Sequence, residues 1–257
     1  MVKAMWTFAT AMNAQQTNID VIANNISNVN TTGFQKDRAE FQDLMYQNAI
    51  VPSSVDSVGS VQVGSGVATS SVTTIFSQGN LYQTKQQLDM AVEGAGFFKI
   101  LLPGGGEGYS RAGAFKRNSD GYMVTADGYY LVPSIQIPAG AESVIISADG
   151  EVSIVNVDEP EPITIGQIQL TLFANPSALR KKGHNIYLST SGSGNPEDGR
   201  PGDTGRGIIA QGFLESSNVN IAEEMIEMIK GQRAYELSSK GIQTADELMA
   251  MANNLRR

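Results

Sequence analysis

The 257-residue sequence lacks cysteine and contains a single histidine, His184. The absence of cysteine excludes disulfides, thiolate metal sites and cysteine nucleophiles, and one histidine excludes a histidine-rich metal site. The formal net charge of −8 argues against a general nucleic-acid-binding protein. No apolar run approaches the length of a membrane span, and Thr7, Thr10 and Asn13 interrupt the N-terminal segment too early for a secretory signal. Composition by itself therefore indicates a cytosolic protein.

The first 26 residues have apolar side chains at alternating steps of three and four, which predicts a helix with a coiled-coil seam. Between Ala4 and Ile26 the only charged residue is Asp20, whereas a helix face in water normally carries charges. We therefore expect this helix to touch protein, or a water-filled lumen, on several sides. The expected seam consists of Met1, Met5, Phe8, Met12, Ile19, Ile22 and Ile26.

The segment from Ile221 to about Asn254 is also predicted to form one long helix. Asn220 is a suitable N-cap, and Glu223 lies at the capping-box position with Glu224 beside it. The apolar stripe expected along this helix consists of Ile221, Met225, Met228, Tyr235, Ile242 and Met249, widened by Ile226, Ile229, Leu237, Leu248 and Leu255.

The tetrapeptide Ser-Asn-Val-Asn occurs twice, at residues 27–30 and 217–220. In the first copy, Asn28 and Asn30 end the N-terminal helix, and Gly33 is free to adopt a positive φ. In the second copy, the asparagines end the preceding chain and start the C-terminal helix. We expect the two turns to lie near the same end of an antiparallel helix pair. Chance recurrence of common turn residues is the alternative.

The middle of the chain has a different composition. Residues 47–70 are rich in Ser, Val and Gly and nearly without charge, which indicates extended or hairpin structure. Short strand-like runs follow, and Asp-Gly pairs at 120–121, 127–128 and 149–150 predict hairpin turns. These runs predict a β-rich domain of about 110–130 residues. The polar stretch 191–207 is expected to be a surface loop that returns the chain to the last helix.

The sequence predicts no catalytic, metal or cofactor site. The glycine-rich run at 104–108 lacks the Lys–Ser/Thr of a P-loop and no helix follows it, so a hairpin loop is expected. His184 stands beside a glycine without Asp or Glu at ligand or relay spacing, which is typical of a loop residue.

Four stretches of the chain together resemble the bacterial flagellar rod and hook proteins. The stretch at 14–47, which contains "NIDVIANNISNVNTTGF", resembles their N-terminal signature. Those at 77–100 ("LDMAVEGAGFFKI") and 109–133 ("YSRAGAF") resemble the central blocks, and that at 211–249 ("QGFLESSNVNIAEE") the C-terminal block. Within the family, the Ser/Val/Gly stretch after Tyr46 resembles that of distal rod subunits. A proximal rod subunit or a short hook-type subunit is the alternative.

The residue patterns and the resemblance together predict an α+β fold. Long terminal helices would form a coiled-coil inner domain, and the β-rich middle domain would follow an extended or hairpin linker. The expected parts are the N-terminal helix of the inner domain (1–35), the linker (36–80), the middle domain (81–215) and the C-terminal helix of the inner domain (216–257).

The resemblance implies a structural subunit, not an enzyme, that needs no cofactor. Such subunits polymerise helically into a hollow, rigid drive shaft that crosses the periplasm, transmits torque to the hook and carries exported subunits. The resemblance also implies export through the flagellar type III apparatus without a cleaved signal peptide. The implied partners are further copies of the chain, proximal rod proteins, the hook protein, and the surrounding periplasmic and outer-membrane rings.

The residues expected in the self-assembly interface are Met5, Phe8, Met12, Ile19, Ile22, Ile26, Asn28, Asn30, Gly33, Phe34, Ile221, Met225, Met228, Tyr235, Leu237, Ile242 and Met249. Those expected to face the lumen are Asn13, Gln15, Gln16 and Asn24. A secreted β-domain binding module, stable as a monomer with ordered ends, is the alternative from another class. An enzyme would require an activity that depends on His184 or on a bound metal.

Overall fold

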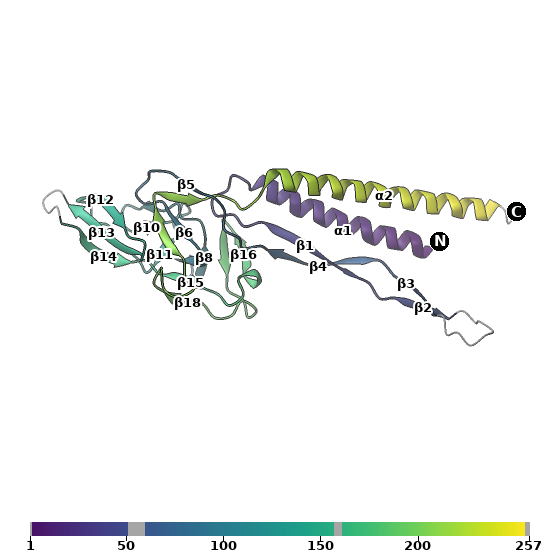
Figure 1. Cartoon of the computed structure of the whole chain (residues 1–257), viewed down its shortest axis with the longest axis horizontal. Coiled ribbons are helices and arrows are strands. Elements are labelled where there is room, and N and C mark those ends of the chain that lie inside the picture. Colours follow the sequence, from purple (N-terminus) through teal and green to yellow (C-terminus); the bar gives the residue numbers. More distant parts are fainter. Residues whose placement is uncertain (1, 51–59, 157–160, 255–257) are drawn as a thin grey trace. The chain divides into compact units, whose positions relative to one another are not determined.

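The computed structural model describes residues 2–50, 60–156 and 161–254, which fall into two compact units. The first unit contains the described residues of 1–27, 37–73 and 220–257, and the second contains those of 28–36 and 74–219. The fold is α+β, with a long helix at each end of the chain and a β-rich middle, as the sequence predicts (Figure 1).

The first unit contains both long helices and two antiparallel ribbons of strands. The two helices begin and end within a residue of their predicted limits, because both their apolar period and their terminal turn residues are local signals. Strands β1 and β4 form one ribbon, and β2 and β3 form the other. The bounds are α1 Val2–Ser27, β1 Asp37–Asp43, β2 Gln47–Ile50, β3 Ser60–Val63, β4 Val67–Thr74 and α2 Ile221–Asn254; Thr74 itself belongs to the second unit.

Helices α1 and α2 lie side by side in antiparallel orientation (Figure 1). Asn25 contacts Glu224 near one end of the pair, and Phe8 lies over Gly241 further along. Residues earlier in α1 therefore contact residues later in α2, so the two helices run antiparallel. The prediction that the two Ser-Asn-Val-Asn turns lie at the same end of an antiparallel pair is confirmed.

The Ser/Val/Gly stretch forms a hairpin in its described part. Gln47 pairs with Val63, and Ile50 pairs with Ser60, so β2 and β3 run antiparallel. The extended or hairpin structure predicted for 47–70 is thus confirmed at both sides of the connection. Residues 51–59 of that prediction lie outside the described residues.

The second unit is built from small antiparallel sheets. Its largest sheet has the order β16-β17-β8-β7-β11-β10-β9, with β15 pairing both β7 and β18; the others are β12-β13-β14, β19-β6 and β20-β5. A short 3₁₀ helix covers Pro176–Ala178. The strands are β5 Leu81–Gln83, β6 Met90–Glu93, β7 Phe97–Leu101, β8 Glu107–Ser110, β9 Lys116–Arg117, β10 Met123–Val124, β11 Tyr130–Val132, β12 Ala141–Ile146, β13 Glu151–Asn156, β14 Ile163–Gln167, β15 Leu170–Leu172, β16 Arg180–Gly183, β17 Ile186–Leu188, β18 Glu197–Gly199, β19 Ile208–Gln211 and β20 Phe213–Glu215.

The three predicted Asp-Gly hairpin turns are confirmed, and they share one geometry. Gly121, Gly128 and Gly150 adopt φ values of 89°, 85° and 85°. Each donates its N–H to the carbonyl three residues earlier, at 3.1, 3.0 and 2.9 Å. A type I turn followed by a left-handed glycine matches the twist of the flanking strands. The run at 104–108 also forms a hairpin connection, between β7 and β8, as predicted.

The predicted loop at 191–207 contains strand β18, so that prediction was wrong in part. Asp198 binds the Thr171 hydroxyl and Lys99, at 3.0 Å from Nζ, and Gly199 pairs with Leu170. This polar segment joins the sheet because the Asp198 carboxylate has binding partners there. Those partners lie elsewhere in the chain, so the residues of the stretch itself do not predict the strand.

The core of the second unit has a large, mainly aliphatic part, a smaller aromatic part, and a third cluster of Ile100, Leu102 and Ile186. The aliphatic cluster includes Met90, Leu131, Ile154 and Ile168, which have almost no exposed surface. The aromatic cluster consists of Phe97, Tyr109, Phe173, Leu179 and Tyr187. Its rings meet edge to face, as in the pair formed by Tyr109 and Phe173 at 4.7 Å between centroids. The β-rich unit thus has a core of its own.

Candidate assembly interface

One face of α2 packs against α1, and we call it the inner face. Small side chains recur on it at seven-residue spacing, at Gly231, Ser238 and Ala245, and all three are buried. A Cβ at Gly231 would lie 3.2 Å from Ile19 Cγ1, so the two helices approach closely there. Seven residues make two helical turns, which keeps these positions on one line. The inner face consists of Glu224, Met228, Gly231, Ser238, Gly241, Ile242, Ala245 and Met249.

The end of the helix pair is closed by a buried polar junction. Asn25, which is 1% exposed, donates from Nδ2 to the Asp37 carbonyl at 2.8 Å and to Glu224 Oε2 at 3.1 Å. Its Oδ1 accepts the Asp37 N–H at 2.9 Å. Asn220 caps α2, because its Oδ1 accepts the Ala222 N–H at 3.1 Å. The junction therefore ties the end of α1 to β1 and to the start of α2.

A second row of apolar residues on α2 is exposed, and we call it the open face. Ile226, Leu237 and Leu248 repeat at intervals of eleven residues, or about three helical turns, and are 54%, 69% and 48% exposed. Ile229 and Met251 extend this row. The prediction that Ile226, Ile229, Leu237, Leu248 and Leu255 widen a single stripe was wrong for the first four, and Leu255 lies outside the described residues. At about 100° per residue the four positions point away from the inner face.

The structure divides the predicted interface residues between covered and exposed positions. On α1, Ile22 is buried and Met5, Phe8, Met12, Ile19 and Ile26 are half-buried. On α2, Met228, Ile242 and Met249 belong to the inner face, whereas Ile221, Met225, Tyr235 and Leu237 are exposed. Asn28 is half-buried, Asn30 is exposed, and Gly33 and Phe34 are buried in the second unit.

The residues predicted to face a lumen are not all equivalent. Asn13, Gln16 and Asn24 are exposed on α1. Gln15 is half-buried, and its Oε1 would lie 3.8 Å from a Cβ at Gly231, which places it on the side of α2.

The segments that leave the two helices are anchored inside the second unit. Gly33 adopts φ +69°, as predicted, and donates its N–H to the Glu215 carbonyl at 2.8 Å. Asn218, from the second Ser-Asn-Val-Asn turn, accepts the Lys36 N–H at 2.8 Å and donates to Gln35 Oε1 at 2.8 Å. Residues 28–36 and 214–219 are thereby fixed to each other.

A buried charge pair lies beside these anchors. Arg111 Nη1 is 3.6 Å from Glu215 Oε2, and Glu215 is fully buried. Glu215 Oε1 accepts from Gln35 Nε2 at 3.1 Å and from the Gly79 N–H at 3.0 Å. Burial lowers the pKa of Arg111, and the Glu215 carboxylate opposes that effect. Losing one member would leave the other charge buried and unpaired, which is strongly destabilising.

Sequence reasoning missed both the Arg111–Glu215 pair and the partner of His184. His184 lies in the tight turn between β16 and β17, and its Nδ1 is 3.2 Å from Asp127 Oδ1. Both residues are exposed, and two chain-distant residues give no spacing signal. Within the described ranges, no group of three or more His, Asp or Glu side chains is arranged to hold a metal ion. Among the same residues, neither helix is both long and apolar enough to cross a bilayer.

Three family descriptions match separate parts of the chain. Residues 5–35 match "Flagella basal body rod protein", residues 91–154 match "Flagellar hook protein FlgE/F/G D1 domain", and residues 210–255 match "Flagellar basal body rod FlgEFG protein C-terminal". The matches cover α1, part of the β-rich unit and α2.

Curated relatives match over nearly the whole length. A flagellar basal-body rod protein FlgG of Borreliella burgdorferi is 47% identical, with 100% of both chains covered. Proteins of the same name in Caulobacter vibrioides and Bacillus subtilis are 43% and 38% identical; they cover 99% and 100% of this chain and are themselves covered completely.

The fold and its surfaces define an α+β protein whose C-terminal helix presents an apolar face that the described residues leave open. Such a face marks a protein interaction surface. The chain belongs to the flagellar basal-body rod protein family. It is a structural subunit of the distal rod of the bacterial flagellum, in the basal body, where the rod crosses the periplasm.

Proposed function

We propose that copies of this chain polymerise helically through their terminal helices into a hollow, rigid shaft. The observation that carries this proposal is the open face of α2, where Ile226, Leu237 and Leu248 are each about half exposed or more. Burial of apolar surface is worth about 25 cal/mol per Å², so a row along the helix supplies a substantial driving force when neighbours cover it. In this proposal the contact is heterologous: the open face of one copy is covered by a different surface of the next. Heterologous contacts that do not close produce a helical filament.

The helix pair would form a coiled coil and belong to an inner domain, with 1–35 and 216–257 as its parts, 36–80 as the linker and 81–215 as the middle domain. Support comes from the seven-residue spacing of Gly231, Ser238 and Ala245 on the inner face. The interface would extend over the predicted α1 and α2 residues. Gly33 and Phe34 would contribute by holding the connecting segment, since they are buried within their own subunit.

The amide-rich side of α1 would line the lumen. Asn13, Gln16 and Asn24 are exposed, and Asp20 is the only charge on α1 after Lys3. Amide side chains, with Asp20 as the one carboxylate on the same face, would give a wet wall of low charge, which suits the passage of exported subunits. Gln15 lies on the side of α2 and is the least suited of the four.

The shaft would transmit torque to the hook and would have no enzymatic activity. Its partners would be proximal rod proteins, the hook protein, the surrounding periplasmic and outer-membrane rings, and the type III apparatus that exports the subunit without a cleaved signal peptide. Membership of the flagellar rod protein family supports partners of this type. An open face on a helix pair supports self-association in particular.

Negative-stain electron microscopy of the concentrated full-length protein tests this proposal. The wild type is expected to form hollow rods with helical order. A variant carrying Ile226→Gln, Leu237→Gln and Leu248→Gln is expected to keep its helix content and to form none. The matched control is Ile145→Gln, which replaces an exposed apolar residue of β12 and should leave rods intact. Rods formed normally by the triple variant would refute an interface on the open face. Monomeric wild type with protease-resistant ends would favour a binding module instead.

A further inference from the structure

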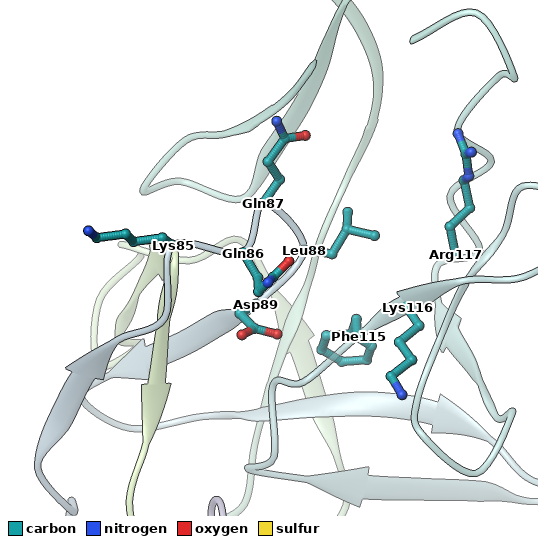
Figure 2. Close-up of a pocket in the computed structure, with 8 residues that line it drawn as sticks. All are labelled: Lys85, Gln86, Gln87, Leu88, Asp89, Phe115, Lys116 and Arg117. Atoms are coloured by element: carbon teal, nitrogen blue, oxygen red, sulfur yellow. The ribbon is translucent and has the colours of Figure 1, made fainter. Parts of the chain in front are cut away.

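An open cleft of about 580 Å³ lies on the second unit (Figure 2). One wall is the segment Lys85–Asp89, which leads from β5 to β6, and the other is Phe115–Arg117, which includes β9. The two walls meet at an isolated antiparallel bridge between Asp89 and Ala114 and diverge from there. Phe115 is buried and forms the apolar floor with half-buried Leu88. The cleft is thus a fork between two chain segments.

The rim of the cleft is cationic, on a chain of formal charge −8. Figure 2 shows Lys85 on one side and Lys116 and Arg117 on the other. All three are exposed, and among the described residues none of them makes an ion pair or a side-chain hydrogen bond. By contrast, Lys99 on the same sheet is paired with both Glu107 and Asp198. Asp89 supplies the one carboxylate of the lining. Three cations against one anion leave the rim in excess positive charge.

Lys85 occupies a backbone conformation that favours glycine. Its φ is 64°, one of few positive values at non-glycine residues of the described chain. A long side chain there strains the turn, whereas glycine would not. Strain of this kind collects at functional sites, where the side chain is used for something other than folding.

The cleft also offers backbone groups. Strand β9 is the last strand in the order of the largest sheet, and among the described strands only β10 pairs with it. An edge strand presents N–H and C=O groups to which an extended segment can add. The site therefore fits an extended, acidic peptide with a small apolar part.

We propose that this cleft binds an acidic segment of a second copy of this chain, Asp158–Glu161. The inference rests on the proposed polymerisation, which brings copies together. The sequence there reads Val-Asp-Glu-Pro-Glu-Pro and places three carboxylates within four residues. This is the densest acidic run in the chain, and its charge matches the three rim cations. Contacts of this type steer subunits and fix their register more than they add affinity.

Fluorescence anisotropy with a labelled peptide of residues 155–164 tests the pairing on the full-length protein. The peptide should bind the wild type and lose affinity when salt is raised from about 50 mM to about 500 mM, because exposed charges are screened. A variant with Lys85→Gly, Lys116→Gln and Arg117→Gln should bind at least about tenfold more weakly. Lys182→Gln, which removes an exposed cation outside the cleft, should bind as the wild type does.

Two further controls distinguish loss of binding at the cleft from loss of folding, and specific binding from general electrostatic attraction. Lys85→Gly alone should keep or raise the unfolding temperature while weakening binding, because it relieves strain and removes charge together. A peptide with Asp158→Asn, Glu159→Gln and Glu161→Gln should not bind. Equal binding of a scrambled peptide of the same composition would overturn the assignment to a second copy and indicate a general acidic ligand.

The failure of this inference and that of the polymer proposal are distinguishable. Peptide binding unchanged in the triple cleft variant, with wild-type rods present, would refute the cleft and leave polymerisation standing. Loss of rods in the open-face variant, with peptide binding intact, is expected because the two surfaces are separate. A wild type that binds no peptide at low salt would also refute the cleft.

Discussion

Replacing Gly33 with alanine should destabilise the β-rich unit through two separate effects. Gly33 has φ +69°, which costs an L-residue about 1 kcal/mol. A Cβ there would also lie 2.6 Å from the Ala112 nitrogen and 2.8 Å from the Arg111 carbonyl carbon. These are backbone atoms, so relief requires the chain to shift. That shift would weaken the 2.8 Å hydrogen bond from Gly33 to the Glu215 carbonyl.

We expect Gly33→Ala to lower the free energy of unfolding by about 3 kcal/mol, since overpacking typically adds about 2 kcal/mol to the backbone cost. For a protein of this size the midpoint of thermal unfolding should fall by roughly 6–12 °C. Scanning calorimetry of the full-length chain measures the change.

Gly128→Ala is the matched control. Gly128 has a similar φ of +85°, but nothing lies within 4 Å of the position that a Cβ would take. Only the backbone cost remains, so the midpoint should fall by roughly 2–4 °C. Equal losses in the two variants would show that the close approach at Gly33 contributes nothing, and the reasoning from its geometry would be wrong.

Two other predictions concern titration and capping. Burial, with a smaller contribution from Glu107, raises the pKa of Tyr109 to about 12, above the value of about 10 in an unfolded chain. Its stabilising contribution should be complete below about pH 10 and decline as the pH rises towards 12. Thermal unfolding of the wild type across this range should show the decline, and the decline should be smaller in Tyr109→Phe. Asn220→Ala should lower the stability of α2 by about 1 kcal/mol, whereas Asn220→Ser should leave it nearly unchanged. Helix content by circular dichroism during denaturation measures this, and equal curves for the two variants would argue against the cap.

The elements specified by neighbouring residues could be predicted from the sequence. The limits of α1 and α2 follow from period and turn residues, and the Asp-Gly hairpins follow from the preference of Gly121, Gly128 and Gly150 for positive φ. Each of these signals lies within a few residues of the structure that it determines. The positive φ of Gly33 was likewise predicted from its neighbouring turn residues.

The faces of α2 could not be separated from the sequence. Met228 and Ile242 lie on one helical row and Ile226 and Leu237 on another, and both rows have the apolar period of a buried helix. The two rows differ in their neighbours, because the small residues Gly231, Ser238 and Ala245 lie on the same face as the first row. The seven-residue spacing that begins at Gly231 was a usable signal, but a glycine in a helix is first read as a cost.

The cleft and the buried charge pair were beyond sequence reasoning for a different reason. Lys85 and Lys116 belong to separate segments that the bridge between Asp89 and Ala114 brings together. Arg111 and Glu215 are also far apart in the chain. Such pairings arise from strand topology, which charge patterns along the chain do not encode.

The small side chains of the inner face have a mechanical consequence. Gly231, Ser238 and Ala245 let the helices approach closely, but they provide few protrusions to oppose sliding of one helix along the other. Axial shear is then resisted at Ile19 over Gly231, at Phe8 over Gly241, and at the hydrogen bonds of Asn25. Under a pulling load the strain would concentrate at these points.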